Sequence, residues 1–503
     1  MKHPKWRPRN SNKSHPWKFI ALPLLTSHGA AAFNPGNHHL LFAAGDCNIN
    51  ARRKRRALVL LASSLQEIDF RDAFSVLDAG LTKGEDLWRP KPFHETSVGW
   101  RETHPQLYRD VIRLCDEELY TLHQSDRMLH EWVCERVSLF RPVAEISRLL
   151  DESSAAMCKR RSRHSTREAR RGNCRVPGRK WEQIEAFAAV MPNLQQPSVE
   201  WCSGKGYLSQ RLLNHGLVSS AVCLEVDSTL CEAGRQIAVQ RKLPIRFEET
   251  DLLKPPLLPL GVPPHATHVA LHACGALHRQ MLRYAVDEMK AADVAVAPCC
   301  YHRYSSSGTL LQPLSRAASQ SRLRLEHEAL RLATVGERTE RGRNARLLKR
   351  ELLWRKAFAV WLRRALRAHR AVSSARGMQK LKIDWKSASR LPSVPKKILS
   401  QGSSTHTSSA EFHAFCRWAL SLTTSNDQLK PAREALLLAL DAWTEREASF
   451  CLDLGAAQMA RIKRLELVRH AYRRALEQWL CLDLCLFLEE RGYEVELLQF
   501  CEQ

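Results

Sequence analysis

The 503-residue sequence lacks any apolar run approaching the roughly 20 residues that a membrane-spanning helix needs. Its only candidate for a secretory signal, residues 18–25, has a basic flank, but the apolar run is short and interrupted by proline. There are 16 cysteines, but they are scattered and no two of them form a Cys-x-x-Cys pair. We therefore expect a cytoplasmic protein with no membrane partner and with reduced thiols.

Acidic residues are also in deficit. The sequence holds 77 Lys and Arg against 53 Asp and Glu, which gives a formal net charge of +24. Such a surplus favours a polyanionic partner such as RNA, because basic side chains neutralise phosphates and release their counterions. The alternative is a basic surface with no such ligand. Many arginines between residues 322 and 370 alternate with glutamates, so part of this charge is ordinary pairing on helices.

Composition and periodicity divide the chain into five parts. The first is polar and basic and ends in five consecutive basic residues, the second has apolar residues at helical spacing, and the third is a basic linker. Helices and strands alternate in the fourth part, and the fifth is arginine-rich and helical. The expected parts are a flexible arm (1–56), a helical domain (57–155), a linker (156–180), an α/β core (181–310) and a helical region (311–503) that ends in a long amphipathic helix (461–490) and a final strand (493–500).

Repeated β-α-β units in the fourth part predict a parallel, doubly wound sheet. The expected strands are 198–201, 220–224, 245–248, 267–272 and 293–297, and the expected helices are 181–191, 207–214, 229–241 and 277–289. Ligands bind such sheets at the carboxyl ends of the strands, where the strand order reverses.

The stretch VEWCSGKGYLSQRLL, Val199–Leu213, contains a Gly-x-Gly loop between the first of these strands and a helix. Gly204 and Gly206 would let a ligand approach the backbone closely, and the helix N-terminus offers free N–H groups. A dinucleotide loop would have a third glycine, but here Cys202 precedes the two that are present. This favours S-adenosylmethionine (SAM) over a pyrophosphate ligand.

Acidic residues follow the next two strands. Glu225 closes the second strand, where a carboxylate can accept two ribose hydroxyls. Asp251 follows the third strand, where it can reach an adenine amino group. The order of the loop and the two acids suits a nucleoside with a ribose diol and adenine. The alternative is that both acids merely solvate the ends of their strands.

Cysteines and histidines follow the fourth and fifth strands, in LHACGALH (271–278) and APCCYH (297–302). If these strands are neighbours, their carboxyl ends bring together His272, Cys274, Cys299, Cys300 and His302.

Three chemistries fit this corner. Residues 298–301 could form a substrate wall, with His272 or His302 as general base and Tyr301 stacking on the substrate or donating a hydrogen bond to it. The thiols could bind zinc, although adjacent cysteines rarely share one ion, so no metal is expected. A thiolate after proline, such as Cys299, could attack carbon 6 of a pyrimidine. Alternatively, the thiols are small apolar fillers.

The segments CSGKGYLS (202–209), LHACG (271–275) and PCCYH (298–302) together resemble the methyltransferase-domain family of eukaryotic methyltransferase-like proteins. A related domain occurs in the glutathione S-transferase C-terminal-domain-containing protein. Bacterial members with helical flanks are similar over more of the chain, including 473–477 and 490–493. The Gly-Lys-Gly and Cys-Cys-Tyr-His segments are also similar to acceptor-stem tRNA 2′-O-methyltransferases, whose Cys/His zinc modules are not apparent here.

The resemblance implies a class I SAM-dependent methyltransferase fold, which is Rossmann-like, at 181–310 with helical flanks. By position, the SAM-contacting set is Glu200, Cys202, Gly204, Gly206, Glu225 and Asp251. Lys205 is expected to point toward a phosphate or to pair with Glu225, and His272 to face the transferred methyl group. The candidate catalytic residues are His272, Cys299, Tyr301 and His302.

The leading hypothesis is thus a SAM-dependent methyltransferase acting on rRNA or tRNA. A protein methyltransferase, in which the helical flanks grip a protein partner, is the second. A non-catalytic binding scaffold that has kept the fold is the third.

Overall fold

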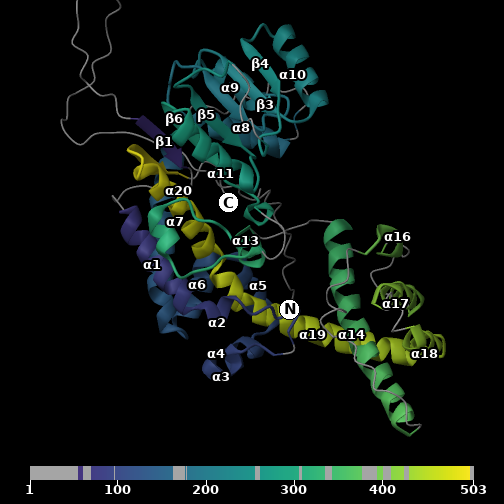
Figure 1. Cartoon of the computed structure of the whole chain (residues 1–503). Coiled ribbons are helices and arrows are strands. Elements are labelled where there is room, and N and C mark those ends of the chain that lie inside the picture. Colours follow the sequence, from purple (N-terminus) through teal and green to yellow (C-terminus); the bar gives the residue numbers. More distant parts are fainter. Residues whose placement is uncertain are drawn as a thin grey trace, which may run out of the picture. The chain divides into compact units, whose positions relative to one another are not determined.

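The structure is a computed structural model and is shown in Figure 1. It describes residues 55–59, 69–95, 97–161, 176, 178–254, 261–304, 309–334, 343–375, 394–399, 409–423 and 430–498. Most of the expected N-terminal arm and of the expected basic linker lies outside these residues.

The chain divides into two compact units, and each is assembled from segments far apart in the sequence. The first unit comprises Met1–Gly84, Leu139–Gly336 and Tyr472–Gln503, and the second comprises Glu85–Ser138 and Glu337–Ala471. The expected helical domain, 57–155, is therefore divided between the two units.

The first unit contains a seven-stranded sheet in the order β4-β3-β2-β5-β6-β1-β7. Its strands are β1 (Arg55–Val59), β2 (Ser198–Trp201), β3 (Ala221–Glu225), β4 (Ile245–Glu249), β5 (Thr267–Leu271), β6 (Asp293–Ala297) and β7 (Tyr493–Leu497). All six pairings between these strands are parallel. The strand order reverses between β2 and β5, so the loop after β2 lies at the switch point of the sheet.

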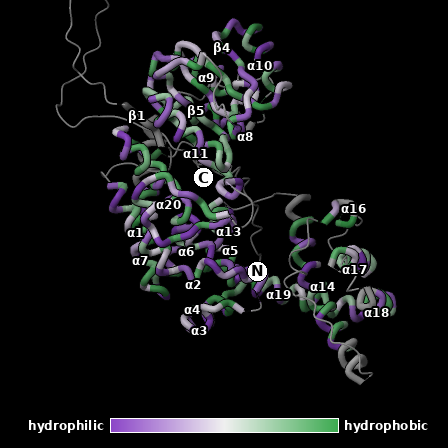
Figure 2. The backbone as a smooth tube through the Cα atoms, viewed as in Figure 1, coloured by the Kyte–Doolittle hydropathy of each residue, from purple (hydrophilic) through white to green (hydrophobic). Residues whose placement is uncertain are grey.

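The expected α/β core is confirmed. Its helices are α8 (Gly178–Val190), α9 (Tyr207–Asn214), α10 (Ser228–Gln240) and α11 (Ala276–Arg283), the last continuing into a π-helical turn, Tyr284–Glu288. Short stretches of sequence specify these elements clearly. The apolar strands β5 and β6 are buried throughout, and Asp227 caps α10 by accepting hydrogen bonds from two backbone N–H groups. Hydrophilic and hydrophobic residues alternate along α10, as expected of a helix that covers a sheet (Figure 2).

Strand β1 was not foreseen. The sequence analysis placed residues 55–56 in the flexible arm and started a helical region at 57, whereas Arg55–Val59 is a strand between β6 and β7. Its five residues carry no alternating pattern, and the strand is formed by pairing with β6 and β7, which are distant in sequence. The final strand was foreseen: β7 spans Tyr493–Leu497, and the predicted residues 499–500 lie outside the described part of the chain.

The prediction of one amphipathic helix at 461–490 is wrong. Two helices, α19 (Glu445–Ala471) and α20 (Arg473–Glu489), meet at Tyr472. Every residue of α20 from Arg474 to Leu488 is buried, so this helix has no solvent face. Its charged residues misled the analysis because they are paired internally: Arg474, for instance, forms ion pairs with Asp151 and Glu477.

Further helices of the first unit surround α20. These are α1 (Phe70–Lys83), α7 (Arg141–Arg161), α12 (Arg316–Gln320) and α13 (His327–Thr334), together with a 3₁₀ turn, η5 (Tyr301–Arg303). The buried helix α20 also packs against β1 and β7. The carboxyl-terminal segment is therefore part of the core on which the sheet rests.

The described residues of the second unit form helices and connecting loops, with no strand among them. Its helices are α2 (Glu85–Trp88), α3 (Trp100–Thr103), α4 (Pro105–Arg113), α5 (Asp116–Gln124), α6 (Asp126–Cys134), α14 (Arg343–Ala375), α16 (Lys396–Leu399), α17 (Ser409–Thr423), α18 (Lys430–Asp441) and α19. An aromatic core that includes Trp354, Phe358, Phe412 and Phe415 joins α14 to α17. Among the helices that the structure describes, none has the length and apolar character needed to cross a membrane.

Candidate active site

The loop between β2 and α9 adopts a left-handed backbone at three positions. The φ angles of Cys202, Gly204 and Gly206 are 55°, 56° and 67°. A Cβ atom on Gly206 would lie 2.7 Å from Cζ of Phe247, so only glycine fits there. A Cβ on Gly204 would meet nothing within 4 Å, so this part of the loop faces open space. The loop is thus packed on the sheet at one glycine and open to a ligand at the other.

Glu225 joins this loop to the end of β3. One carboxylate oxygen, Oε2, accepts a hydrogen bond of 2.8 Å from the backbone N–H of Gly204. The other, Oε1, accepts from the N–H groups of Val226 (2.9 Å) and Asp227 (3.2 Å). Lys205 does not pair with Glu225, which was one of the two possibilities considered; its carbonyl accepts from the side chain of Gln210 instead.

Glu200 lies behind the loop. Its Oε2 accepts a hydrogen bond of 2.9 Å from the backbone N–H of Ser209 in α9 and lies 3.8 Å from Sγ of Cys223. Burial raises the pKa of Glu200 to about 7, although the hydrogen bonds from Ser209 act in the opposite direction. The geometry makes Glu200 a brace between β2 and α9 rather than a residue that faces a ligand.

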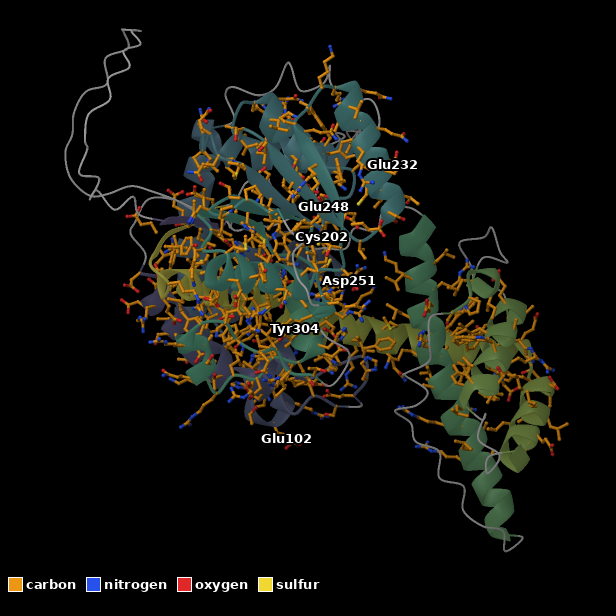
Figure 3. All side chains as sticks on the ribbon, turned by 45° about the horizontal axis from the view of Figure 1, so that its top comes forward. Glu102, Cys202, Glu232, Glu248, Asp251 and Tyr304 are labelled. Carbon is orange, nitrogen blue, oxygen red and sulfur yellow. The ribbon has the colours of Figure 1, made fainter. Side chains whose placement is uncertain are left out.

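Cys202 and Asp251 follow β2 and β4 at the carboxyl edge of the sheet (Figure 3). Burial raises the pKa of the Cys202 thiol to about 12, so this thiol is neutral. Asp251 accepts a hydrogen bond from the backbone of Leu253 and forms a 2.8 Å ion pair with Lys254, and these contacts lower the pKa of its carboxyl group. Asp251 is therefore an anionic acceptor.

Backbone contacts join the loops after β5 and β6, which the sequence analysis expected to be neighbours. The N–H of Gly275 donates a hydrogen bond of 3.1 Å to the carbonyl of Cys299. A Cβ on Gly275 would lie only 2.3 Å from the carbonyl oxygen of Arg303, and the φ of Gly275 is 64°. Gly275 is a functional position that the analysis missed, although its place in LHACG was a usable signal. It allows the two loops to touch.

This contact gathers three thiols. Cys274, Cys299 and Cys300 have sulfur atoms that all lie within 4.8 Å of one another. Hydrogen bonds from Cys274 and Cys299 lower the pKa of the Cys300 thiol far below its usual value. The corresponding contacts with Cys274 and Cys300, together with burial, raise the pKa of Cys299. The contacts within the group thus act in opposite directions on the two adjacent thiols, and the role of Cys299 as a nucleophile stays a prediction.

The two residues that follow the thiols point in different directions. Tyr301 is buried, and its hydroxyl lies 3.4 Å from Sγ of Cys481 in α20. A ring that faces the interior does not fit the expected role of stacking on a substrate. His302 is partly exposed, and its Nδ1 lies 3.4 Å from the hydroxyl of Thr334. Burial lowers the pKa of His302.

His272 ends β5 in a left-handed conformation, with a φ of 72°. Burial, with a smaller contribution from the positive charge of Lys180, lowers its pKa to about 4. The imidazole is therefore neutral at physiological pH and able to accept a proton. His272 and Cys274 lie in the loop after β5, which is hydrogen-bonded to the loop after β6 through Gly275 and Cys299.

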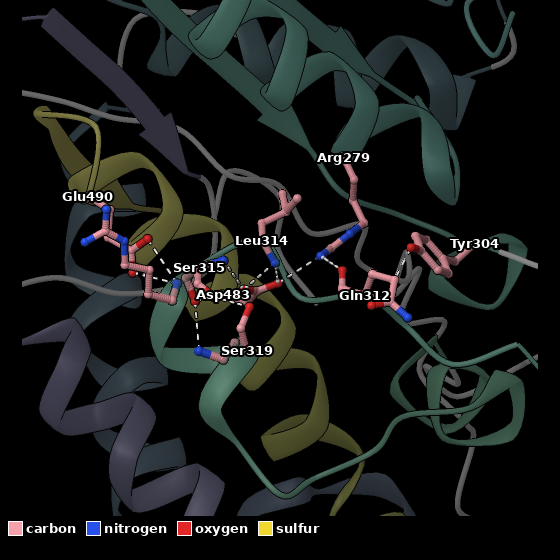
Figure 4. A network of polar contacts seen from close by, with 10 residues as sticks. Arg279, Tyr304, Gln312, Leu314, Ser315, Ser319, Asp483 and Glu490 are labelled. Atoms are coloured by element: carbon pink, nitrogen blue, oxygen red, sulfur yellow. Dashed lines mark hydrogen bonds and ion pairs between the residues drawn. The ribbon is translucent and has the colours of Figure 1, made fainter.

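A buried polar network joins α11 to α20 (Figure 4). Asp483 of α20 is fully buried and accepts hydrogen bonds from the backbone N–H groups of Leu314 and Ser315 and from the hydroxyl of Ser315. It also forms a 3.0 Å ion pair with Arg279 of α11. Arg279 in turn donates to the carbonyl of Gln312. The network fixes α11, which follows the Cys274 loop, to the buried carboxyl-terminal helix.

A comparison with known protein families found a match that covers most residues of this site. Residues 179–307 match the family model described as a methyltransferase domain. This part of the chain is therefore similar to methyltransferase domains. The match includes β2 to β6, the glycine loop and the three thiols, and the parallel sheet has the Rossmann-like arrangement that the resemblance implied. No curated protein matches the chain.

The part of the chain that matches the methyltransferase model is almost neutral. Residues 179–307 contain 13 Lys and Arg against 12 Asp and Glu, so nearly all of the net charge of +24 lies in the rest of the chain. Helix α14 alone contains ten Lys and Arg and a single glutamate. If the basic charge serves a polyanion, the flanking segments rather than the domain surface carry that role.

Proposed function

We propose that the protein is a SAM-dependent methyltransferase. The observation that carries this proposal is the pairing of Gly204 with Glu225 at the switch point of the sheet. Glu225 uses three backbone N–H contacts, and a carboxylate has about four acceptor positions. It can therefore hold the loop in place and still accept a hydrogen bond from a ribose hydroxyl.

The neighbouring residues complete a binding site for the cofactor. Gly204 leaves open space beside the loop backbone, where the methionine portion of SAM would lie. Asp251 is an anionic acceptor that follows β4, the strand next to β3. The adenine of SAM would lie there, beyond the ribose that Glu225 would bind. His272 and Cys300, after β5 and β6, border the opposite side of the switch point. Methyl transfer from a sulfonium requires alignment above all, and His272 would serve as the base when the acceptor must lose a proton.

Calorimetric titration of SAM tests the cofactor assignment. We expect micromolar binding by the wild type and a loss of at least about tenfold in Glu225→Ala, because both the ribose contact and the anchor of Gly204 disappear. Glu225→Gln keeps an acceptor for Gly204 but lacks a carboxylate, so its affinity should lie between those two. Glu232→Ala, on the exposed face of α10, is the matched control and should bind normally. If the folded wild type does not bind SAM, the proposal is refuted, and the hypothesis of a non-catalytic binding scaffold is favoured instead.

We also propose that the methyl acceptor is RNA, either rRNA or tRNA. Helix α14 supports this, because its single glutamate neutralises only a small part of its charge: Glu351 pairs with Arg355. Lys349, Arg364 and Arg367 are exposed on the same helix. Contacts from such side chains to phosphates would provide affinity without sequence readout.

The salt dependence of RNA binding tests this second proposal. In Lys349→Glu/Arg367→Glu, the affinity for a structured RNA should fall, and the slope of log K against log salt should decrease by about two. Arg283→Glu, a charge reversal on the methyltransferase domain, should change neither quantity, and SAM binding should be normal in all variants. If RNA binding is weak and independent of salt while labelled methyl groups appear on protein, the acceptor is a protein.

A further inference from the structure

The three thiols after β5 and β6 form a group that methyl transfer does not require. Sγ of Cys274 lies 3.3 Å from Sγ of Cys299, and the sulfur of Cys300 lies within 4.8 Å of both. Among the described residues, no histidine or carboxylate atom joins this close group. The cluster therefore consists of three sulfur atoms, from two partly buried cysteines and one buried cysteine.

The spacing of the sulfur atoms suits a soft metal ion. Zinc binds thiolates at about 2.3 Å in tetrahedral geometry, which places two ligating sulfurs about 3.8 Å apart. The three atoms here span the same range, from 3.3 Å for the closest pair to within 4.8 Å for all of them. A zinc ion above the triangle would need only small movements of the side chains.

Adjacent cysteines in an extended chain point to opposite sides, which argued from sequence against a shared ion. The backbone of Cys300 removes this objection, because its φ of 47° is left-handed and breaks the alternation. Non-glycine residues adopt such a conformation at an energetic cost, and they keep it where the surroundings enforce it. Here the contact between Gly275 and the backbone of Arg303 holds the two loops together. The cluster is thus built by the fold rather than by chance proximity.

The geometry points to a three-thiolate site for Zn²⁺ formed by Cys274, Cys299 and Cys300. On binding, each thiol releases its proton to solvent, and the fourth coordination position is left to water or to another external ligand. A site with three protein ligands and an open position is typical of zinc that acts on a bound molecule rather than of purely structural zinc. This inference does not rest on SAM binding or on the RNA acceptor.

Titration of the fully reduced, metal-free protein with Co²⁺ provides the first test. We expect one equivalent to bind with a sulfur-to-cobalt charge-transfer band in the near ultraviolet, and an equimolar amount of Zn²⁺ to displace it. Cys274→Ser and Cys300→Ser should each weaken Zn²⁺ binding by at least about 100-fold, since one of three ligands is lost. Cys115→Ser is the matched control: Cys115 is an exposed thiol that caps α5, a role that serine also fills.

A second measurement requires no variant and so avoids any folding defect. Zn²⁺ should slow the alkylation of Cys274, Cys299 and Cys300, located by peptide mass spectrometry, and leave the alkylation of Cys115 unchanged. The proposal is overturned if Co²⁺ produces no charge-transfer band, or if the band persists unchanged in both cluster variants. It is also overturned if Zn²⁺ protects none of the three thiols. The proposal also fails if the isolated protein contains a Cys274–Cys299 disulfide and the protein binds no metal after that disulfide has been reduced. In that case the two cysteines form a redox site.

Discussion

Replacement of Asp483 tests whether the buried network that joins α11 to α20 holds the first unit together. The Asp483 side chain is completely buried and that of Arg279 is 6% exposed, so neither can turn to water when the other is removed. Breaking a buried ion pair from one side costs about 3 to 5 kcal/mol, because an uncompensated charge remains. Asp483→Ala also leaves the N–H groups of Leu314 and Ser315 without their acceptor. We expect the free energy of unfolding to fall by at least about 3 kcal/mol.

A double-mutant cycle separates the ion pair from the backbone contacts. Asp483→Asn retains an oxygen for Leu314 and Ser315 but leaves the buried Arg279 without its counter-charge, so it should cost about 3 kcal/mol or more. Arg279→Met should cost a similar amount because it leaves a buried carboxylate. The double variant buries no charge and should be more stable than the sum of the single changes predicts, with a coupling of about 1 to 3 kcal/mol.

Urea unfolding followed by far-ultraviolet circular dichroism measures these values, with hydrogen exchange in α11 and α20 to localise the effect. Asp453→Asn, the same substitution at an exposed position in α19, is the control and should stay within about 0.5 kcal/mol of the wild type. If the Asp483 and Arg279 effects were additive, the network would not act as an ion pair, and the reasoning would be wrong.

Two further predictions concern the loop at the switch point. Gly206→Ala should destabilise the protein by about 2 kcal/mol or more, because alanine at a φ of 67° is strained and its Cβ would overlap Phe247; a melting curve with no shift would contradict this packing. Glu200 has a pKa of about 7 in the fold against an ordinary value of 4.5, so the folded state binds its proton more tightly. Stability from this group is fully present below pH 4.5 and is lost as the pH rises to 7. We expect the free energy of unfolding in urea to fall by about 1 to 3 kcal/mol more in the wild type than in Glu200→Gln when the pH is raised from 4.5 to 8. If both proteins show the same pH dependence of stability, Glu200 is not buried as described.

Several features of the site followed from the sequence because they depend on local chemistry. The strands of the α/β core are short apolar runs, and a chain of such runs separated by capped helices has few arrangements other than a parallel sheet. Once β5 and β6 are neighbours, Cys274 must lie near Cys299 and Cys300, as expected. The glycine loop and Glu225 were expected at the same edge of the sheet, because the carboxyl ends of parallel strands lie together.

The direction of individual side chains depended on the tertiary structure. The left-handed turn at Cys300 and its two neighbouring thiols lower the pKa of Cys300, and neither feature can be read from the letters PCCYH. Tyr301 turns inward because Cys481, 180 residues later in the chain, lies beneath it. Glu200 faces α9, although its place near the end of β2, just before the loop, resembles that of a ligand-binding acid.

The sequence by itself therefore determined the order of the core elements and the edge at which the chemistry gathers. Only the tertiary structure decided that β1 enters the sheet beside β7, that α20 is buried on all sides and that Asp483 neutralises Arg279. The physical reason is the range of the interactions. Periodicity and capping act over a few residues, whereas the pairing of β1 with β7 and the contact between Arg279 and Asp483 join residues more than 200 positions apart, whose partners no local pattern specifies.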